Sequence, residues 1–202
     1  WGLDWIHKLH PSREELIHQV ADDRDHLGFK MPHEDAANYG WGKNKYRPAY
    51  FANGKPQGLG KYKSESTGVS NVAGRSAAAL ALGHQIFKGI PGHLPFAAQC
   101  LQDATELYEM GKKREGFQQG NSYGAPYRYN ERTWADDMEW GAAALFKATG
   151  DKKYLNDALH YADLIGFTSW MEMDSAAHYE MYPYVNMGHY ALWQVVNDKN
   201  IR

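Results

Sequence analysis

The clearest pattern along this chain is a pair of apolar stripes at helical spacing between residues 134 and 166. In the first stripe, apolar side chains recur at Ala135, Met138, Ala142 and Leu145 or Phe146. A spacing of three to four residues places such side chains on one face of a helix. The second stripe has the same spacing: Tyr154, Ala158, Tyr161 or Ala162, and Ile165.

Residues that favour helix ends separate the two stripes. Thr133 is a candidate N-cap for the first helix, and Asp136 stands three residues later as in a capping box. Gly150 suits the left-handed residue that ends many helices, and Asp151 suits the N-cap of the next one. Gly166 ends the second stripe in the same way. The segment therefore predicts two helices joined by a very short turn.

Helical patterns recur elsewhere in the chain. Ser12 followed by Glu15 resembles a capping box and predicts a short helix that runs to Val20. The segment from Arg75 to Phe87 is rich in Ala and Leu and apolar on most sides, which predicts a buried helix. The additional predicted helices are residues 1–9, 12–20, 75–87, 95–113 and 185–197.

Three irregular segments, 22–69, 116–132 and 167–184, separate these helices. Gly, Pro, Asn, Lys and Tyr dominate the first, and the second is rich in Tyr, Asn and Gly. No segment alternates apolar and polar residues for long, so we expect few and short strands. The fold class is therefore predicted to be all-α. Loops as long as these are uncommon in compact domains and are often functional. In a ring of helical hairpins they would gather at one end and build a cleft.

Composition narrows the functional classes. The chain has 202 residues, enough for one domain, and its net charge of −2 gives no electrostatic reason to expect nucleic acid or an acidic membrane surface. No apolar run approaches the roughly 20 residues that a membrane helix needs. The only cysteine, Cys100, lies in a helical pattern and is expected to be a buried structural thiol. The 7 Trp and 14 Tyr suit both sugar stacking and ordinary core packing.

Several segments, in order, resemble the family-9 glycoside hydrolases, the cellulase family. They are Trp1–Ser12 with the Leu16–His26 segment (LIHQVADDRDH), Tyr46–Tyr50 (YRPAY), Ser70–Ala81 (SNVAGRSAAALA) and the hairpin that begins at Trp134. The resemblance covers nearly the whole chain. It implies an (α/α)6 barrel, of which this chain would hold about half, and an enzyme that hydrolyses β-1,4-linked sugars with inversion.

The same resemblance implies that no catalytic residue lies in this chain. The family's catalytic base belongs to an Asp-Ala-Gly-Asp motif upstream of the helix that opens the chain, and its catalytic acid is a Glu further downstream. Since the chain also opens inside a helical pattern at Trp1, we expect residues 1–202 to be an internal part of one catalytic domain.

Candidate substrate-binding residues lie in the irregular segments and beside them. The resemblance places His26 in the cleft, whereas a loop residue bonded to Asp25 is the plainer alternative. Exposed aromatic rings in the segment before the hairpin would stack on sugar rings, or would pack on their own helices. Asp137 is freer than Asp136 to face the cleft. Asn186 and His189, three residues apart, would share a helical face. The full predicted set is His26, Phe29, Tyr127, Tyr129, Trp134, Asp137, Trp170, Asn186 and His189.

No metal or cofactor is predicted. His18, His26 and His33 are eight and seven residues apart, and this spacing matches no zinc motif. The expected partner is an oligosaccharide or polysaccharide.

Two alternative functions stay open. Asn71 and Arg75 depart from the family pattern, and the long loop with Glu34 and Asp35 would suit an exo-acting enzyme on glucosamine oligosaccharides. A carbohydrate-binding protein without catalysis is the second alternative. The family is typically secreted or periplasmic, and an oligosaccharide-processing branch would also suit the cytoplasm.

Overall fold

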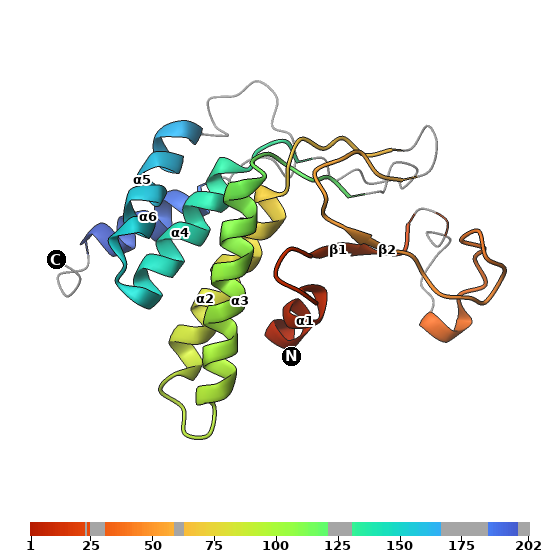
Figure 1. Ribbon diagram of the computed structural model, residues 1–202, viewed down its shortest axis with the longest axis horizontal. Coiled ribbons are helices and arrows are strands. Elements are labelled where there is room, and N and C mark those ends of the chain that lie inside the picture. The colour runs from red at the N-terminus through yellow and green to blue at the C-terminus, as the bar shows by residue number, and fades with distance from the viewer. Residues whose placement is uncertain (23, 25–30, 59–62, 121–130, 167–185, 198–202) are drawn as a thin grey trace.

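The computed structural model describes residues 1–22, 24, 31–58, 63–120, 131–166 and 186–197. Helices dominate these residues, which confirms the all-α prediction (Figure 1). The helices are α1 (Gly2–Leu9), α2 (Ser70–Phe87), α3 (Leu94–Lys113), α4 (Ala135–Thr149), α5 (Lys152–Ile165) and α6 (Met187–Asn197). The remaining elements are β1 (Ile17–Val20), the 3-10 turn η2 (Pro32–Glu34) and β2 (Ala49–Phe51).

The helices form two layers. α2, α4 and α6 pack side by side, while α3 and α5 cover them as the second arms of the hairpins α2–α3 and α4–α5 (Figure 1). The core lies between the layers, and fully buried side chains such as Leu80, Leu107 and Leu145 fill it. This is the arc of hairpins that the sequence predicts.

Glycines let the three neighbouring helices approach at backbone distance. A Cβ atom on Gly74 of α2 would lie 2.6 Å from the carbonyl oxygen of Asp137 in α4. A Cβ on Gly188 of α6 would lie 2.6 Å from the carbonyl oxygen of Asp136. Only glycine fits such crossings without moving a helix, so these positions fix how closely α2, α4 and α6 pack.

The α4–α5 hairpin matches its prediction in most details. Gly150 ends α4 with φ of 74°, and the Asp151 side chain accepts a hydrogen bond from the Lys153 backbone N–H at 3.0 Å. The predicted N-cap at Thr133 is wrong, because Trp134 precedes the helix and makes no side-chain cap. The first turn of α4 is buried against α2 and α6, so packing rather than a capping box fixes where this helix begins.

The predicted helix over residues 12–20 is also wrong. Ser12 Oγ does donate to Glu15 Oε2 at 2.8 Å, but residues 17–20 form β1, which pairs antiparallel with β2. The Ala52 N–H donates to the Leu16 carbonyl at 2.7 Å beside this pairing. The partner strand lies about thirty residues along the chain, and its hydrogen bonds outweigh the local helical signal.

The boundaries of two further helices differ from the sequence prediction. α2 begins at Ser70, five residues before the predicted start, because the Ser70 hydroxyl is buried and donates to the Gly111 carbonyl at 2.9 Å. α6 begins at Met187, two residues later than predicted. Cys100 is fully buried as expected, and burial raises the pKa of its thiol to about 11. Among the described helices, none combines the length and apolarity needed to cross a membrane.

Candidate functional site

The N-terminal ends of α2, α4 and α6 meet at one end of the arc. The irregular chain before α2 and after α3 lies there too, since Ser66 forms an isolated bridge with Gln118. Asn71 Oδ1, at the start of α2, accepts from the Gln118 backbone N–H at 2.9 Å. Residues 53–54 and 65–68 of the first irregular segment therefore meet residues 117–119 of the second at this rim. The segment 167–184 lies outside the described residues.

Five polar residues at this end form a network that we call the rim cluster: Asn71, Arg75, Glu131, Asp136 and Asp137. The Arg75 guanidinium donates to both oxygens of Asp137, with Nε–Oδ1 at 2.8 Å and Nη2–Oδ2 at 2.7 Å. It also pairs with Glu131, whose second oxygen accepts from Asn71 Nδ2 at 3.1 Å. Residues of α2 thus bind both the first turn of α4 and the segment that leads into it.

Burial sets the charge balance of this cluster. It raises the pKa of Asp136 to about 6, and the nearby negative charge of Glu131 adds to the shift. Burial also raises the pKa of Asp137, and the Arg75 guanidinium opposes that shift. Desolvation works against the charge on Arg75, but its hydrogen bonds to Asp137 leave its pKa raised. We treat the Arg75–Asp137 pair as ionised, because both carboxylate oxygens accept N–H bonds from the guanidinium.

A second polar group lies deeper, between α4 and α6. Glu139 is fully buried, and its Oε1 lies 2.9 Å from His189 Nδ1. His189 Nε2 lies 2.7 Å from the carbonyl oxygen of Gly166, the residue that ends α5. A carbonyl oxygen accepts only, so Nε2 carries a proton.

The pKa values of this pair are both raised. Burial raises the pKa of Glu139 to about 7, and His189 opposes the shift. Burial works against the charge on His189, but the Gly166 carbonyl and Glu139 leave its pKa raised. Folding therefore favours protons on both groups.

The structure describes four of the nine predicted substrate-binding residues. Trp134 is half-buried and packs edge-on against Tyr161, with ring centroids 6.0 Å apart. Asp137 belongs to the rim cluster, and His189 binds Glu139. Asn186 immediately precedes α6, one turn from His189. Their role in binding sugar stays a prediction, and His26, Phe29, Tyr127, Tyr129 and Trp170 lie outside the described residues.

Sequence reasoning missed the residues that connect this site. Arg75 and Asn71 stood out only as departures from a family pattern, and nothing in their spacing indicated a pairing with Asp137 or Glu131, which are 62 and 60 residues away. Glu139 lies on the apolar face of α4, four residues after Ala135 and seven before Phe146, so its helical position was a signal for burial that sequence reasoning did not use. It is buried because α4 is covered by α2, α5 and α6.

The arrangement of the rim cluster suits positioning better than proton transfer. Asp136 and Asp137 are neighbours in one helical turn and are both buried, so they cannot flank a glycosidic bond from opposite sides. The rim cluster holds Glu131 against α2 through Arg75 and Asn71, and Arg75 in turn binds Asp137 of α4. Glu131 directly follows segment 121–130, which carries Tyr127 and Tyr129.

Comparison with known proteins decides the family. Residues 1–200 match the profile described as glycosyl hydrolase family 9. The chain belongs to this family. Among its relatives, it is 30% identical over 171 residues to Endoglucanase 5 of Arabidopsis thaliana and 29% identical over 173 residues to Endoglucanase 2 of Oryza sativa subsp. japonica. Each alignment covers 84% of this chain and 24% of the relative.

Solved structures of family-9 enzymes confirm the fold as part of an (α/α)6 barrel. The endoglucanase of the termite Nasutitermes takasagoensis superposes with a TM-score of 0.69 at 24% identity, over all of this chain and 40% of the termite chain. The cellulase Cel9M of C. cellulolyticum in complex with cellobiose gives 0.66 at 25% identity, over 98% and 40%. This family-9 chain thus spans about a quarter of its plant relatives and two fifths of these structures. The relatives lend no support to the glucosaminidase or binding-only alternatives.

Proposed function

We propose that the protein containing this chain is a cellulase-type glycoside hydrolase that cleaves β-1,4-linked glucans, and that residues 1–202 are part of its one catalytic domain. The observation that carries this proposal is the family-9 match over residues 1–200, together with plant relatives that are named endoglucanases. The cellobiose bound to Cel9M, a glucan fragment, supports the substrate class.

The proposed mechanism is inverting hydrolysis. One carboxylate activates a water molecule while a carboxylic acid on the other side protonates the leaving oxygen, with roughly 6.5–9.5 Å between them. The family resemblance puts both groups outside this chain. The contribution of residues 1–202 is then to bind and orient the sugar chain.

Within that role, the rim cluster positions the sugar-binding segment. Arg75 and Asn71 hold Glu131, the residue that follows segment 121–130, and the bidentate pair with Asp137 holds Arg75 in turn. Fixing a binding loop before the substrate arrives reduces the ordering cost of binding. His26, Tyr127, Tyr129 and Trp134 are the residues that we propose to contact sugar.

The test is hydrolysis of defined oligosaccharides by the complete protein. We expect it to release shorter products from cellohexaose and to leave glucosamine hexamers intact, as chromatography of the products would show. The 202-residue chain alone should hydrolyse neither. If the protein hydrolysed the glucosamine hexamer but not cellohexaose, the proposed substrate would be wrong. If it bound cellohexaose without hydrolysing it, the protein would be a carbohydrate-binding protein and not an enzyme.

A further inference from the structure

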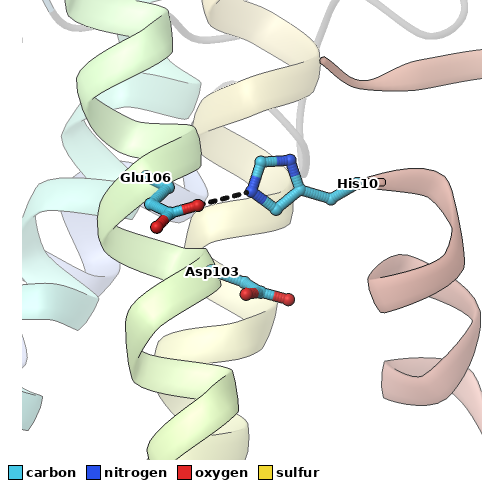
Figure 2. Close-up of side chains that lie close together, drawn as sticks. All are labelled: His10, Asp103 and Glu106. Carbon is cyan, nitrogen blue, oxygen red and sulfur yellow. Dashed lines mark hydrogen bonds and ion pairs between the residues drawn. The ribbon is translucent and has the colours of Figure 1, made fainter. Parts of the chain in front are cut away.

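Polar contacts attach α1 to the rest of the molecule. None of its residues is fully buried, although Leu3, Ile6 and Leu9 pack partly against the core. His7 and His10, at the end of α1, face Asp103 and Glu106 on α3. Asp103 and Glu106 are three residues apart and share one face of α3, while His10 directly follows the last residue of α1. Figure 2 shows the His10 ring, which extends from the residue after α1, directed at the Glu106 carboxylate, with Asp103 on the same helix as Glu106.

The atoms that face each other here are all potential metal ligands. His10 Nε2 lies 3.3 Å from Glu106 Oε2, and the ligand atoms of His10, Asp103 and Glu106 all lie within 4.8 Å of one another. His10 and Asp103 are buried, and Glu106 is half-buried. These groups converge from α3 and from the residue that follows α1, so they are not a run of charges along one element.

The His10 ring is oriented so that its Nε2 faces the Glu106 carboxylate. Its Nδ1 lies 2.7 Å from the backbone carbonyl of Glu15, which can only accept, so Nδ1 carries the proton. Nε2 is then the ring nitrogen available to a metal ion. Without an ion, its 3.3 Å contact with Glu106 Oε2 requires a proton between the two atoms, which a bound cation would replace. An imidazole whose other nitrogen donates to a backbone carbonyl is the usual arrangement of a metal-binding histidine.

We propose that His10, Asp103 and Glu106 bind one Zn²⁺ ion that links α1 to α3. An imidazole nitrogen with two carboxylates suits zinc, whereas Ca²⁺ and Mg²⁺ prefer oxygen ligands alone. Zinc bonds of about 2.1 Å in tetrahedral geometry put ligand atoms about 3.4 Å apart. The His10–Glu106 distance already fits this value, and the ligand atom of Asp103 lies within 4.8 Å of the other two. Water would supply the fourth ligand.

The surroundings support such a site. His7 Nδ1 and Gln99 Nε2 bind the two oxygens of Asp103 and hold its carboxylate in place. Glu106 also lines a surface groove of about 420 Å³, which gives an ion a route from solvent. Lys112 and Lys113 border that groove, but they pair with Asp157 and Glu14, so their charge is partly compensated.

Zinc binding to the complete protein tests this site. After treatment with chelator, calorimetric titration should show a Zn²⁺ site that Glu106→Gln weakens at least tenfold, since the variant loses an anionic ligand but keeps its size. Glu109→Gln, one turn further along α3 and exposed, is the matched control and should bind Zn²⁺ like the wild type. Zn²⁺ should raise the melting temperature of the wild type, and Ca²⁺ should not raise it through this site.

Equal zinc affinity in the Glu106→Gln variant and the wild type would overturn the proposal, as would the absence of zinc binding. The group would then be an imidazolium–carboxylate ion pair. Anomalous scattering at the zinc edge, from wild-type crystals soaked in Zn²⁺, needs no variant. A peak between His10 and Glu106 supports the site, and its absence in zinc-saturated crystals rejects it.

Discussion

At the scale of single residues, Arg75 holds the rim together. It is the one described side chain that contacts both Asp137 and Glu131. Replacing Arg75 by Ala leaves the buried Asp137 carboxylate without its cation. We expect the free energy of unfolding to fall by about 2 to 3 kcal/mol. Urea denaturation of the complete protein measures this loss.

The Arg75→Lys variant is the informative comparison. A lysine keeps the charge but cannot donate to both oxygens of Asp137, so it should recover only part of the lost stability. Full recovery would show that charge alone matters here. An Arg75→Ala variant as stable as the wild type would contradict the role that we assign to the pair.

Glu139 predicts a pH dependence. Its pKa is raised by burial to about 7 in the folded protein, from about 4.5 when unfolded. Folding then takes up a proton, so this group stabilises the fold most at low pH and loses that effect as pH rises through 7. Between pH 5 and 8 the loss amounts to about 2 kcal/mol. The raised pKa of His189 acts in the same direction.

The Glu139→Gln variant isolates this effect, because an amide imitates the neutral acid at every pH. We expect the difference in free energy of unfolding, variant minus wild type, to increase by about 2 kcal/mol from pH 5 to pH 8. Denaturation midpoints at several pH values provide the measurement. Asp163→Asn, an exposed site on α5, serves as the control with no such trend. Parallel pH profiles for the wild type and the Glu139→Gln variant would refute the assignment.

The residues of the site show where sequence reasoning ends. Asp151 and Gly150 could be assigned from sequence, because a helix cap depends on neighbours within a few positions. The pairing of Arg75 with Asp137 joins residues 62 positions apart, and that of His10 with Glu106 joins residues 96 positions apart. Local spacing carries no information on such pairs, so the sequence predicted no metal site.

At the scale of elements, the close crossing of α2 and α4 depends on Gly74. A methyl group there would meet the backbone of Asp137 and Met138, which cannot give way as a flexible side chain would. Gly74→Ala should therefore destabilise the protein by about 1 to 3 kcal/mol, although alanine favours helices. Thermal melts measure the effect. Gly89→Ala is the control, since nothing lies within 4 Å of its added carbon.

A Gly74→Ala variant that melts like the Gly89→Ala variant would mean that the inner helices tolerate a wider spacing.

The elements themselves were largely predictable. Helices with long apolar stripes, such as α3 and α4, matched within one or two residues because burial and periodicity agree there. The prediction for residues 17–20 was wrong because they form a strand only by pairing with β2, and local sequence patterns do not reveal that partner.

At the scale of the whole molecule, the chain by itself leaves apolar surface uncovered. Trp193 and Tyr190 stack on the outer side of α6 and are more than half exposed, as are Leu82 and Ile86 on α2. These residues match the apolar seam expected of a partial barrel. The solved relatives are more than twice as long as the part that this chain matches.

We therefore expect the isolated 202-residue chain to self-associate, whereas the complete protein keeps these side chains covered. Sedimentation velocity over a range of concentrations distinguishes the two. The Trp193→Glu variant of the isolated chain should associate less, because it places a charge in the exposed apolar patch. A monomeric isolated chain at high concentration would show that this surface needs no cover.

We propose that this chain helps to build an inverting, cellulase-type active site whose catalytic carboxylates lie outside residues 1–202. The most direct measurement is proton NMR of the anomer first formed when the complete protein hydrolyses cellohexaose. Inversion at the anomeric carbon gives α-anomeric product from the β-linked substrate, and we expect no product from the isolated chain. First-formed β-anomer, or hydrolysis by the isolated chain, would contradict it.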